Sequence, residues 1–356
     1  MRVAHINLSA DLRGSEYQTL ALTRALTKEV DQRLILRSGS RLLERAAQVR
    51  GCQIRPVANS FIAAARATED CDLIHIHDTS TKAGALASLW GRPFVVTRRQ
   101  LQPPANSLLT RWCYSRAAGL VGVSNAARDA LQSYADDTER VQTIYDGVPL
   151  PEFAVADVPE GRKREPRFIV ACIGELDEAI KGQRTVFDAA RALRKGYPEI
   201  AFWIIGRGKD EARLRAIAAS LPNVRFGGWI ADMTTCYRDI DLVVHPSRNE
   251  ALGSVILEAM SFGIPVVGTR VGGIPEIVRP GYNGALVDID DGQALAEQIA
   301  KLYLDPAQLR LQGANARRSA ERFSTTAMAT QYAALYRQIL AAQHAPPAHR
   351  PMDLSP

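Results

Sequence analysis

The sequence predicts an α/β protein built from two doubly wound, Rossmann-like domains that face each other across a crevice. Short apolar runs alternate with helix-length amphipathic segments along nearly all of the 356 residues, which is the pattern of βαβ units and parallel sheets. A segment rich in proline, glycine and charge interrupts this alternation once, near residues 147–167. A chain of this length also has room for about two domains.

Seven apolar runs predict the strands of the first domain, at residues 3–8, 33–36, 53–57, 73–76, 94–97, 120–123 and 141–144. Helical segments such as 16–28 and 125–133 separate them. Six further runs predict the strands of the second domain, at 168–173, 201–205, 224–226, 242–244, 265–268 and 285–287.

These boundaries predict four parts of the chain. The first domain spans residues 1–150, and residues 151–166 form a linker. The second domain spans 167–343, and its last helix is expected to pack back on the first domain. The proline-rich tail at 344–356 is expected to be disordered. A ligand should bind in the crevice, at the carboxyl ends of both sheets.

The composition narrows the class of protein. With 46% apolar and 23% charged residues, the chain is neither intrinsically disordered, nor collagen, nor a coiled-coil rod. The five cysteines are scattered and form no CxxC, which favours reduced thiols in a cytoplasmic protein. The N-terminus lacks the features of a signal peptide, and no apolar run is long enough for a membrane span. We therefore expect a cytoplasmic protein, peripheral at most at the inner face of a membrane.

The charge is concentrated in the first domain. Residues 1–150 hold 19 Lys/Arg and 14 Asp/Glu, which suits either an anionic partner or an arginine-rich solvated surface. A phosphorylated acceptor or an anionic membrane fits better than nucleic acid, because no basic motif interleaved with aromatics is present. The segment 111–116 is either an interfacial helix or part of the core; its place between two strands favours the core for Trp112 and Tyr114.

Two glutamates separated by seven residues form the densest chemical signal. Glu250 lies in a loop just after the apolar run LVVH, and Glu258 lies about one turn into a helix that begins at Gly253 and Ser254. The start of a helix offers unpaired N–H groups and the positive end of its dipole, which bind anions. A capping box would need its acid at Leu257, so that role fails for Glu258. Two carboxylates beside a phosphate site suit a nucleotide sugar.

The segment 246–278 resembles the motif of the retaining glycosyltransferases of family 4, also called glycosyl transferases group 1. That motif is Pro-Ser, an acidic residue, a glycine, a second glutamate that continues as Glu-Ala-Met, then Gly-x-Pro-Val-Val and Gly-Gly-x-x-Glu. The chain carries all of it between Pro246 and Glu276. The resemblance implies the two-domain GT-B fold, in which the first domain binds the acceptor and the second domain binds the nucleotide sugar. It also implies that Glu250 holds hydroxyls of the donor sugar and that Glu258 holds the ribose.

A second constellation is GELDEAIKG at 174–182, between a strand and a helix. A lysine at this place can neutralise a developing phosphate charge. The family pattern here has an arginine and a lysine on the diphosphate; Lys181 matches the lysine, but Glu175 occupies the arginine position. A substitute cation could come from Arg184, Arg207, Lys209 or Arg248, and the sequence does not choose among them.

Polar residues also follow strands of the first domain. The resemblance places Arg13 and Gly14 at the crevice and His77 near the donor sugar. Successive side chains of a strand point to opposite faces, so His75 and His77, two positions apart, should point the same way. Two histidines of one strand rarely complete a metal site. We expect no metal. Arg98 and Arg99 either bind an anionic acceptor or form solvated surface.

The resemblance implies a metal-independent hexosyl-type transferase of class EC 2.4 that uses a UDP- or GDP-sugar and no cofactor. We expect it to act in bacterial envelope polysaccharide, exopolysaccharide or lipopolysaccharide synthesis. A nucleotide-sugar 2-epimerase and a non-catalytic nucleotide-sugar-binding protein remain as alternatives. The expected catalytic residues are His77, Lys181 and Glu250, and the expected donor contacts are Arg13, Gly14, Gly174, Lys181, Arg184, Arg207, Ile230, Glu250, Leu252, Gly253, Ser254 and Glu258.

Overall fold

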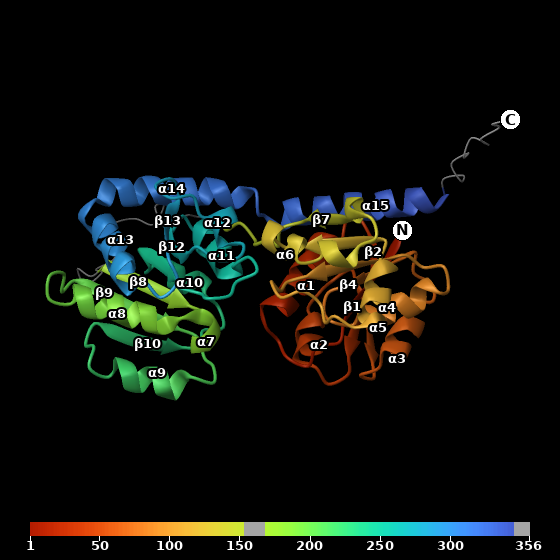
Figure 1. The fold of residues 1–356 in the computed structure, drawn as a ribbon, viewed down its shortest axis with the longest axis horizontal. Helices are drawn as coiled ribbons and strands as arrows, with labels where there is room; N and C mark the ends of the chain where they lie inside the picture. The colour runs from red at the N-terminus through yellow and green to blue at the C-terminus, as the bar shows by residue number, and fades with distance from the viewer. Residues whose placement is uncertain (153–167, 345–356) are drawn as a thin grey trace.

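The computed structural model describes residues 1–152 and 168–344 and contains two parallel α/β domains side by side (Figure 1). This confirms the predicted fold class. Nearly all of the predicted linker at 151–166 lies outside the described residues, as does the predicted disordered tail beyond residue 344. No helix in the described ranges is long and apolar enough to cross a membrane.

The first domain holds a seven-stranded parallel sheet in the order β3-β2-β1-β4-β5-β6-β7. The order reverses between β1 and β4, so the carboxyl ends of these two strands form the expected ligand crevice. The strands are β1 (Arg2–Asn7), β2 (Asp31–Arg37), β3 (Gln53–Val57), β4 (Leu73–Ile76), β5 (Phe94–Arg98), β6 (Gly119–Gly122) and β7 (Val141–Thr143). The helices are α1 (Gly14–Ala25), α2 (Arg41–Ala46), α3 (Phe61–Arg66), α4 (Thr81–Ser88), α5 (Leu108–Ser115) and α6 (Asn125–Asp129), with 3-10 turns at Gln132–Tyr134 and Thr138–Arg140.

The second domain holds a six-stranded parallel sheet in the order β10-β9-β8-β11-β12-β13, which reverses between β8 and β11. Its strands are β8 (Phe168–Ile173), β9 (Ile200–Ile205), β10 (Val224–Gly228), β11 (Leu242–His245), β12 (Val266–Thr269) and β13 (Gly284–Val287). The helices are α7 (Glu178–Lys181), α8 (Gln183–Leu193), α9 (Glu211–Ala218), α10 (Thr234–Tyr237), α11 (Ser254–Ser261), α12 (Ile274–Ile277), α13 (Gly292–Leu304), α14 (Pro306–Glu321) and α15 (Thr325–His344).

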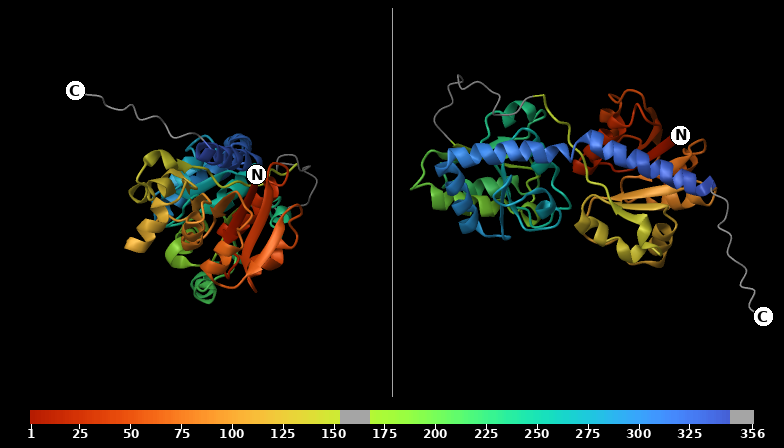
Figure 2. Two further views of the ribbon diagram at one scale, coloured as in Figure 1. Left: turned by 90° about the vertical axis from the view of Figure 1, so that its right-hand side faces the viewer. Right: turned by 90° about the horizontal axis from the view of Figure 1, so that it is seen from above.

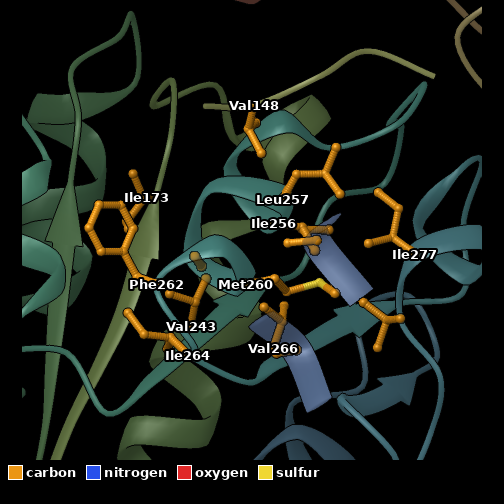
Figure 3. Close-up of a cluster of buried hydrophobic side chains, with 14 of the residues drawn as sticks. Val148, Ile173, Val243, Ile256, Leu257, Met260, Phe262, Ile264, Val266 and Ile277 are labelled. Atoms are coloured by element: carbon orange, nitrogen blue, oxygen red, sulfur yellow. The ribbon is translucent and has the colours of Figure 1, made fainter. Parts of the chain in front are cut away.

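Helices cover both faces of each sheet. In the first domain, α3, α4 and α5 pack on one face, and α1 packs on the other together with α15. The two last helices, α14 and α15, run one after the other across both domains (Figure 2). In the second domain, α11 anchors its buried face in a core that also contains Val243 and Val266 from neighbouring strands; Figure 3 shows Ile256, Leu257 and Met260 pointing into it.

Two sequence predictions need correction. The helix predicted at 125–133 is shorter, because α6 ends at Asp129 and a 3-10 turn follows. On α5, Tyr114 is buried as predicted, but Trp112 is 40% exposed and does not belong to the core. Residues two apart on a helix lie roughly 200° apart around its axis, so Trp112 and Tyr114 cannot both face the sheet.

Candidate functional site

Glu250 lies in the loop that follows β11, at the point where the second sheet reverses its order. Its Oε2 accepts a hydrogen bond from Lys181 Nζ at 2.6 Å and lies 2.9 Å from His245 Nε2. The hydroxyl of Ser247 lies 3.1 Å from the same histidine nitrogen. The structure therefore brings together Lys181 and Glu250, which the sequence separates by 69 positions.

The charge around Glu250 is balanced by its partners. Burial alone would raise the pKa of this carboxyl, but the hydrogen bond with His245 and the charge of Lys181 outweigh burial and lower the pKa to about 2. Glu250 is therefore ionised at every pH at which the protein would be assayed. An ionised carboxylate accepts hydrogen bonds and donates none, so it suits the hydroxyl groups of a sugar.

Two close backbone approaches fix Glu250 and Lys181. Gly182, which follows Lys181, has a φ of +60°, and a Cβ there would collide with the carbonyl of Pro246. Gly272 has a φ of +52°, and its Cβ would collide with the carbonyl of Glu250. The adjacent Gly273 donates its N–H to that carbonyl at 3.2 Å. Only glycine fits these positions, which explains why the Gly-Gly motif accompanies Glu250.

The helix α11 begins beside Glu250 with its N-terminus toward the first domain. Gly253, with a φ of +102°, precedes the helix, and no side chain from the described residues caps it. A Cβ on Gly14 of α1 would lie 4.0 Å from Ser254 Oγ, so the starts of α1 and α11 meet across the crevice. The side chain of Arg13 is largely exposed and lies 3.6 Å from Asp11. Leu252 is buried in the core, so only its backbone is available to a donor.

Glu258 lies one turn farther along α11. Burial raises the pKa of its carboxyl, and the hydroxyl of Tyr237, 3.2 Å from Oε2, opposes the shift. Ile230, after β10, packs into the same core as Tyr237. Next to it, the Arg207 guanidinium stacks on the exposed ring of Trp229 at 4.9 Å. Tyr237 and Trp229 could not be predicted as part of the site, because neither lies in one of the sequence motifs.

We expect Glu258→Ala to weaken binding of UDP roughly tenfold to hundredfold, since a hydrogen bond to a charged group contributes about 1.5–3 kcal/mol. Isothermal titration calorimetry measures this change. The exposed Glu297→Ala variant on α13 removes the same charge from the same domain and should bind UDP as the native chain does. An unchanged dissociation constant for Glu258→Ala would remove this residue from the donor site.

The four candidate substitutes for the missing arginine differ in whether they already form an ion pair. Lys209 pairs with Asp177 at 2.8 Å. Arg248 pairs with Asp290 at 2.7 Å and with Glu178. Among the described residues, Arg184 and Arg207 form no ion pair, and both are exposed.

Glu175 follows Gly174 at the end of β8 and is exposed. Its backbone carbonyl accepts a hydrogen bond from Gln183, and its carboxylate has no ion-pair partner among the described residues. Arg184 and Arg207 therefore remain as the candidates for a second cation at the diphosphate.

The first domain contains a cavity of about 580 Å³ at the carboxyl ends of its strands, within the range of small-ligand sites. Its lining includes Arg13, Glu16, His77, Lys82 and Arg99. Glu16 is buried and accepts the backbone N–H of Arg13 at 3.0 Å, so it fixes the start of α1.

His77 belongs to a buried group of three histidines. Its Nε2 lies 3.0 Å from His5 Nδ1, whereas its Nδ1 has no hydrogen-bond partner among the described residues. The rings of His75 and His77 lie 3.8 Å apart, so they point the same way, as predicted. Burial, together with the neighbouring His75 and His5, lowers the pKa of His77 well below its usual range. His77 is therefore neutral and can hold a hydroxyl by a hydrogen bond.

The same three histidines are the residues of the described chain that come close enough together to hold a metal ion, with ligand atoms within 4.8 Å of one another. Both ring nitrogens of His75 are already engaged, by the Tyr336 hydroxyl at 2.6 Å and the Thr97 hydroxyl at 2.7 Å. Side-chain hydrogen bonds thus engage both nitrogens of His75 and one nitrogen each of His5 and His77, whereas His5 Nε2 and His77 Nδ1 have no partner among the described residues.

Arg98 and Arg99 are buried, which excludes the solvated surface that the sequence left open for them. Arg99 pairs with the buried Asp146, with Nε 2.9 Å from Oδ2, and its Nη2 has no partner among the described residues. Arg98 donates to the carbonyl of Gln102. Arg99 therefore has a free N–H donor beside His77, while the hydrogen bond of Arg98 holds the loop after β5.

Glu276, the last residue of the Gly-Gly motif, connects the two domains. Its carboxylate accepts the backbone N–H groups of Asn125 at 2.9 Å and Ala126 at 3.1 Å, and the hydroxyl of Tyr145 at 2.9 Å. These donors belong to the start of α6 and the segment after β7. No sequence pattern predicts this contact, because the partners of Glu276 lie more than 100 positions away.

We expect Glu276→Ala to lower kcat/KM about tenfold, because charged hydrogen bonds of about 1.5–3 kcal/mol hold the domains together. UDP affinity should change little, since the residues expected to hold the ribose and the diphosphate, Glu258 and Lys181, belong to the second domain. Steady-state kinetics and calorimetry separate the two effects. Glu276→Gln retains one acceptor oxygen and should fall between the native chain and Glu276→Ala. A native kcat/KM in Glu276→Ala would contradict this role.

The sequence was compared with those of known proteins. Residues 12–151 match the family model described as Glycosyltransferase Family 4, and residues 167–305 match the one described as Glycosyl transferases group 1. The D-inositol 3-phosphate glycosyltransferase of Salinispora arenicola is 32% identical over 305 residues, which cover 73% of this chain and 67% of that protein. The protein of the same name from Salinispora tropica is 31% identical, and the match covers 73% of this chain and 62% of the relative.

A shorter match involves the lipopolysaccharide core biosynthesis glycosyltransferase LpsE of Rhizobium meliloti, 35% identical over 140 residues, covering 38% of this chain and 40% of LpsE. Among solved structures, Anabaena Alr3699/HepE in complex with UDP-glucose superposes with a TM-score of 0.82 at 22% identity. That superposition covers 95% of this chain and 100% of HepE. At this identity the likeness concerns the fold.

Proposed function

Since the chain belongs to glycosyltransferase family 4, we propose that it transfers a sugar from a nucleotide-sugar donor to an acceptor hydroxyl with retention of anomeric configuration. The observation that carries the proposal is the pair of Lys181 and Glu250 beside the start of α11, opposite Gly14 of the first domain. A cation, a carboxylate and free helix N–H groups meet there at the crevice.

The diphosphate of the donor would bind at the start of α11 and at Lys181. Backbone N–H groups and the helix dipole favour negative charge, and a pre-placed ammonium stabilises the charge that develops on the leaving group. Arg184 or Arg207 supplies the second cation. Trp229, stacked with Arg207, is placed to contact the nucleobase, and Glu258 is placed to hold the ribose.

The sugar would lie between Glu250 and His77. The bond between its anomeric carbon and the phosphate oxygen breaks, and the electron pair leaves with the nucleoside diphosphate. The acceptor oxygen bonds to the anomeric carbon from the same face, and a phosphate oxygen takes the acceptor proton. Such a reaction depends on position and charge, which are what Lys181 and Glu250 supply.

The site and the proteins similar to this chain support a particular class of donor. HepE was solved with UDP-glucose, which supports a UDP-sugar ahead of a GDP-sugar. The acceptor would enter the cavity of the first domain, where Arg13, Lys82 and Arg99 favour a phosphorylated sugar or glycolipid. The relatives named for inositol phosphate and for lipopolysaccharide core support such an acceptor, and with it a cytoplasmic enzyme of bacterial envelope glycan synthesis.

A thermal-shift screen of nucleotide sugars tests the proposal. A donor at 100 times its dissociation constant should stabilise the chain by about 2.7 kcal/mol. The stabilising donor is then incubated without an acceptor. Slow release of the nucleoside diphosphate supports a transferase, conversion of UDP-N-acetylglucosamine to its 2-epimer supports an isomerase, and an intact donor supports a binding protein.

We expect sugar transfer to survive an excess of EDTA. Protein cations and a helix N-terminus offset the charge of the leaving group, so the proposed reaction does not call for a metal ion. The rate of nucleoside diphosphate release, measured before and after EDTA treatment, checks this. Loss of the rate, restored by manganese or magnesium alone, would contradict the mechanism and would direct attention to His5, His75 and His77.

A further inference from the structure

The outer side of α5 carries apolar groups where a surface helix normally carries polar ones. Leu108, Trp112 and Arg116 follow one another at intervals of four and lie on one stripe of the helix. Leu108 is 88% exposed and Trp112 is 40% exposed, whereas Cys113 and Tyr114 face the sheet. The stripe therefore ends in a cation and is otherwise apolar.

The neighbouring helices extend this surface. Packed on one face of the sheet, α4 contacts α3 on one side and α5 on the other (Figure 1). Leu89 and Trp90 follow α4 and are more than half exposed, and Phe61 begins α3 with its ring 42% exposed. We call this surface the α3–α5 face; its exposed large side chains are Phe61, Ile62, Leu89, Trp90, Leu108, Leu109 and Trp112.

Each exposed aromatic ring of the α3–α5 face has a cation over it. The distances to the ring centroids are 5.6 Å for Arg116 over Trp112, 5.7 Å for Arg92 over Trp90 and 5.4 Å for Lys82 over Phe61. Residues 79–128, which supply α4 and α5, contain no Asp or Glu. Of their seven Lys/Arg, Arg98 and Arg99 are buried and Arg128 pairs with Asp129, which leaves Lys82, Arg92, Arg111 and Arg116. The face is thus apolar and positively charged at once.

We propose that the α3–α5 face docks on an anionic lipid surface. Tryptophan favours the boundary between lipid and water, amphipathic helices lie in that boundary with their apolar face inward, and Lys and Arg are attracted to anionic headgroups. A folded protein partner would also bury apolar groups, but cations of one sign over each exposed ring, from Lys82, Arg92 and Arg116, match a surface of uniform negative charge.

Docking in this orientation would bring the cavity of the first domain close to the lipid surface. What this implies for the acceptor rests on the proposed function. The same three helices contribute Phe61, Lys82 and Tyr114 to the lining of the first-domain cavity. An acceptor anchored in the lipid would then have its sugar end beside this cavity. The substrate class that fits this placement is a sugar carried on a lipid.

Co-sedimentation of the full chain with vesicles of equal parts phosphatidylglycerol and phosphatidylcholine tests the proposal. Binding is expected at low salt, and it should weaken on vesicles of phosphatidylcholine alone. Arg92→Gln with Arg116→Gln should lower the partition coefficient about tenfold to thirtyfold. Trp90→Ser with Leu108→Ser should lower it at least about tenfold. All four residues lie outside the lining of the cavity.

Two control variants match these changes on α14 and at the end of α13 of the second domain. Arg310→Gln with Arg318→Gln removes the same charge from exposed positions, and Leu304→Ser with Leu311→Ser removes exposed leucines. Both should bind the vesicles as the native chain does. Equal binding by the α3–α5 variants and the controls would overturn the proposal, as would no binding to phosphatidylglycerol vesicles.

Two further readouts keep the outcomes distinct. If sedimentation equilibrium shows a dimer that Trp90→Ser with Leu108→Ser dissociates, while vesicle binding is unchanged, the face is a self-association surface and the proposal fails. UDP titration keeps the proposed function separate, because the α3–α5 variants should bind UDP normally. Lys181→Ala should in turn bind vesicles normally. The vesicle-binding test therefore remains valid even if the proposed donor site is wrong.

Discussion

Lys181→Ala is expected to lower kcat by about 10²–10³, the scale seen when one group that stabilises a developing negative charge is removed. The negative charge of the diphosphate grows as the glycosidic bond breaks, so the ammonium acts mainly on turnover and less on KM. The effect should be large here because Glu175 occupies the position of a second cation. Steady-state release of the nucleoside diphosphate measures kcat and KM separately.

The control for this variant is Lys195→Ala, which removes an exposed lysine from the same domain and should leave kcat unchanged. Arg184→Ala and Arg207→Ala identify the second cation, because the one that contacts the diphosphate should show a loss of similar size. A native kcat in Lys181→Ala, with the fold intact by circular dichroism, would exclude Lys181 from the reaction.

Glu250→Gln is the second large effect, and we expect a loss of about tenfold to hundredfold in kcat/KM. A hydrogen bond to a charged acceptor contributes about 1.5–3 kcal/mol, and the amide keeps the shape of the side chain without its charge. The pKa of about 2 means that Glu250 is ionised throughout the assay range. The kcat/KM of the native enzyme should therefore not fall toward that of Glu250→Gln through protonation of Glu250 at any pH between about 5 and 8, the range in which an ordinary histidine titrates.

The exposed Glu321→Gln variant on α14 is the matched control. Lys181 and Glu250 contact each other, so the double variant Lys181→Ala with Glu250→Gln should lose less than the product of the two single losses. A loss in the double variant equal to the two single losses multiplied together would show that the two side chains act independently and would argue against the shared site.

The sequence was sufficient to predict the elements of the fold, because buried parallel strands are continuous apolar runs and each is bounded by turn residues. Motif spacing also selected Glu250, Lys181 and Glu258 as candidates, and the structure places Lys181 and Glu250 in contact. Local patterns fix which residues follow a strand, and parallel strands place those residues at one edge of a sheet. This is why residues 69 positions apart could be assigned to one site.

Contacts between the domains could not be predicted in the same way. Glu276 accepts backbone N–H groups of α6, and any exposed helix start would offer the same groups, so nothing in their sequence marks them. Arg99 is another case, because only the fold places Asp146 beside it. The orientation of Trp112 depends on which side of α5 meets the sheet, and two aromatic residues spaced by two leave that choice open.

The central claim, that a nucleotide sugar reacts at the site formed by Lys181 and Glu250, is tested most directly by proton NMR of the stabilising donor during incubation with the native chain. For UDP-glucose, whose anomeric bond is α, we predict release of UDP together with a sugar product that is α when it first appears. Lys181→Ala should release both products about 10²–10³ times more slowly. A β product, or equal release by the native chain and Lys181→Ala, would contradict the claim.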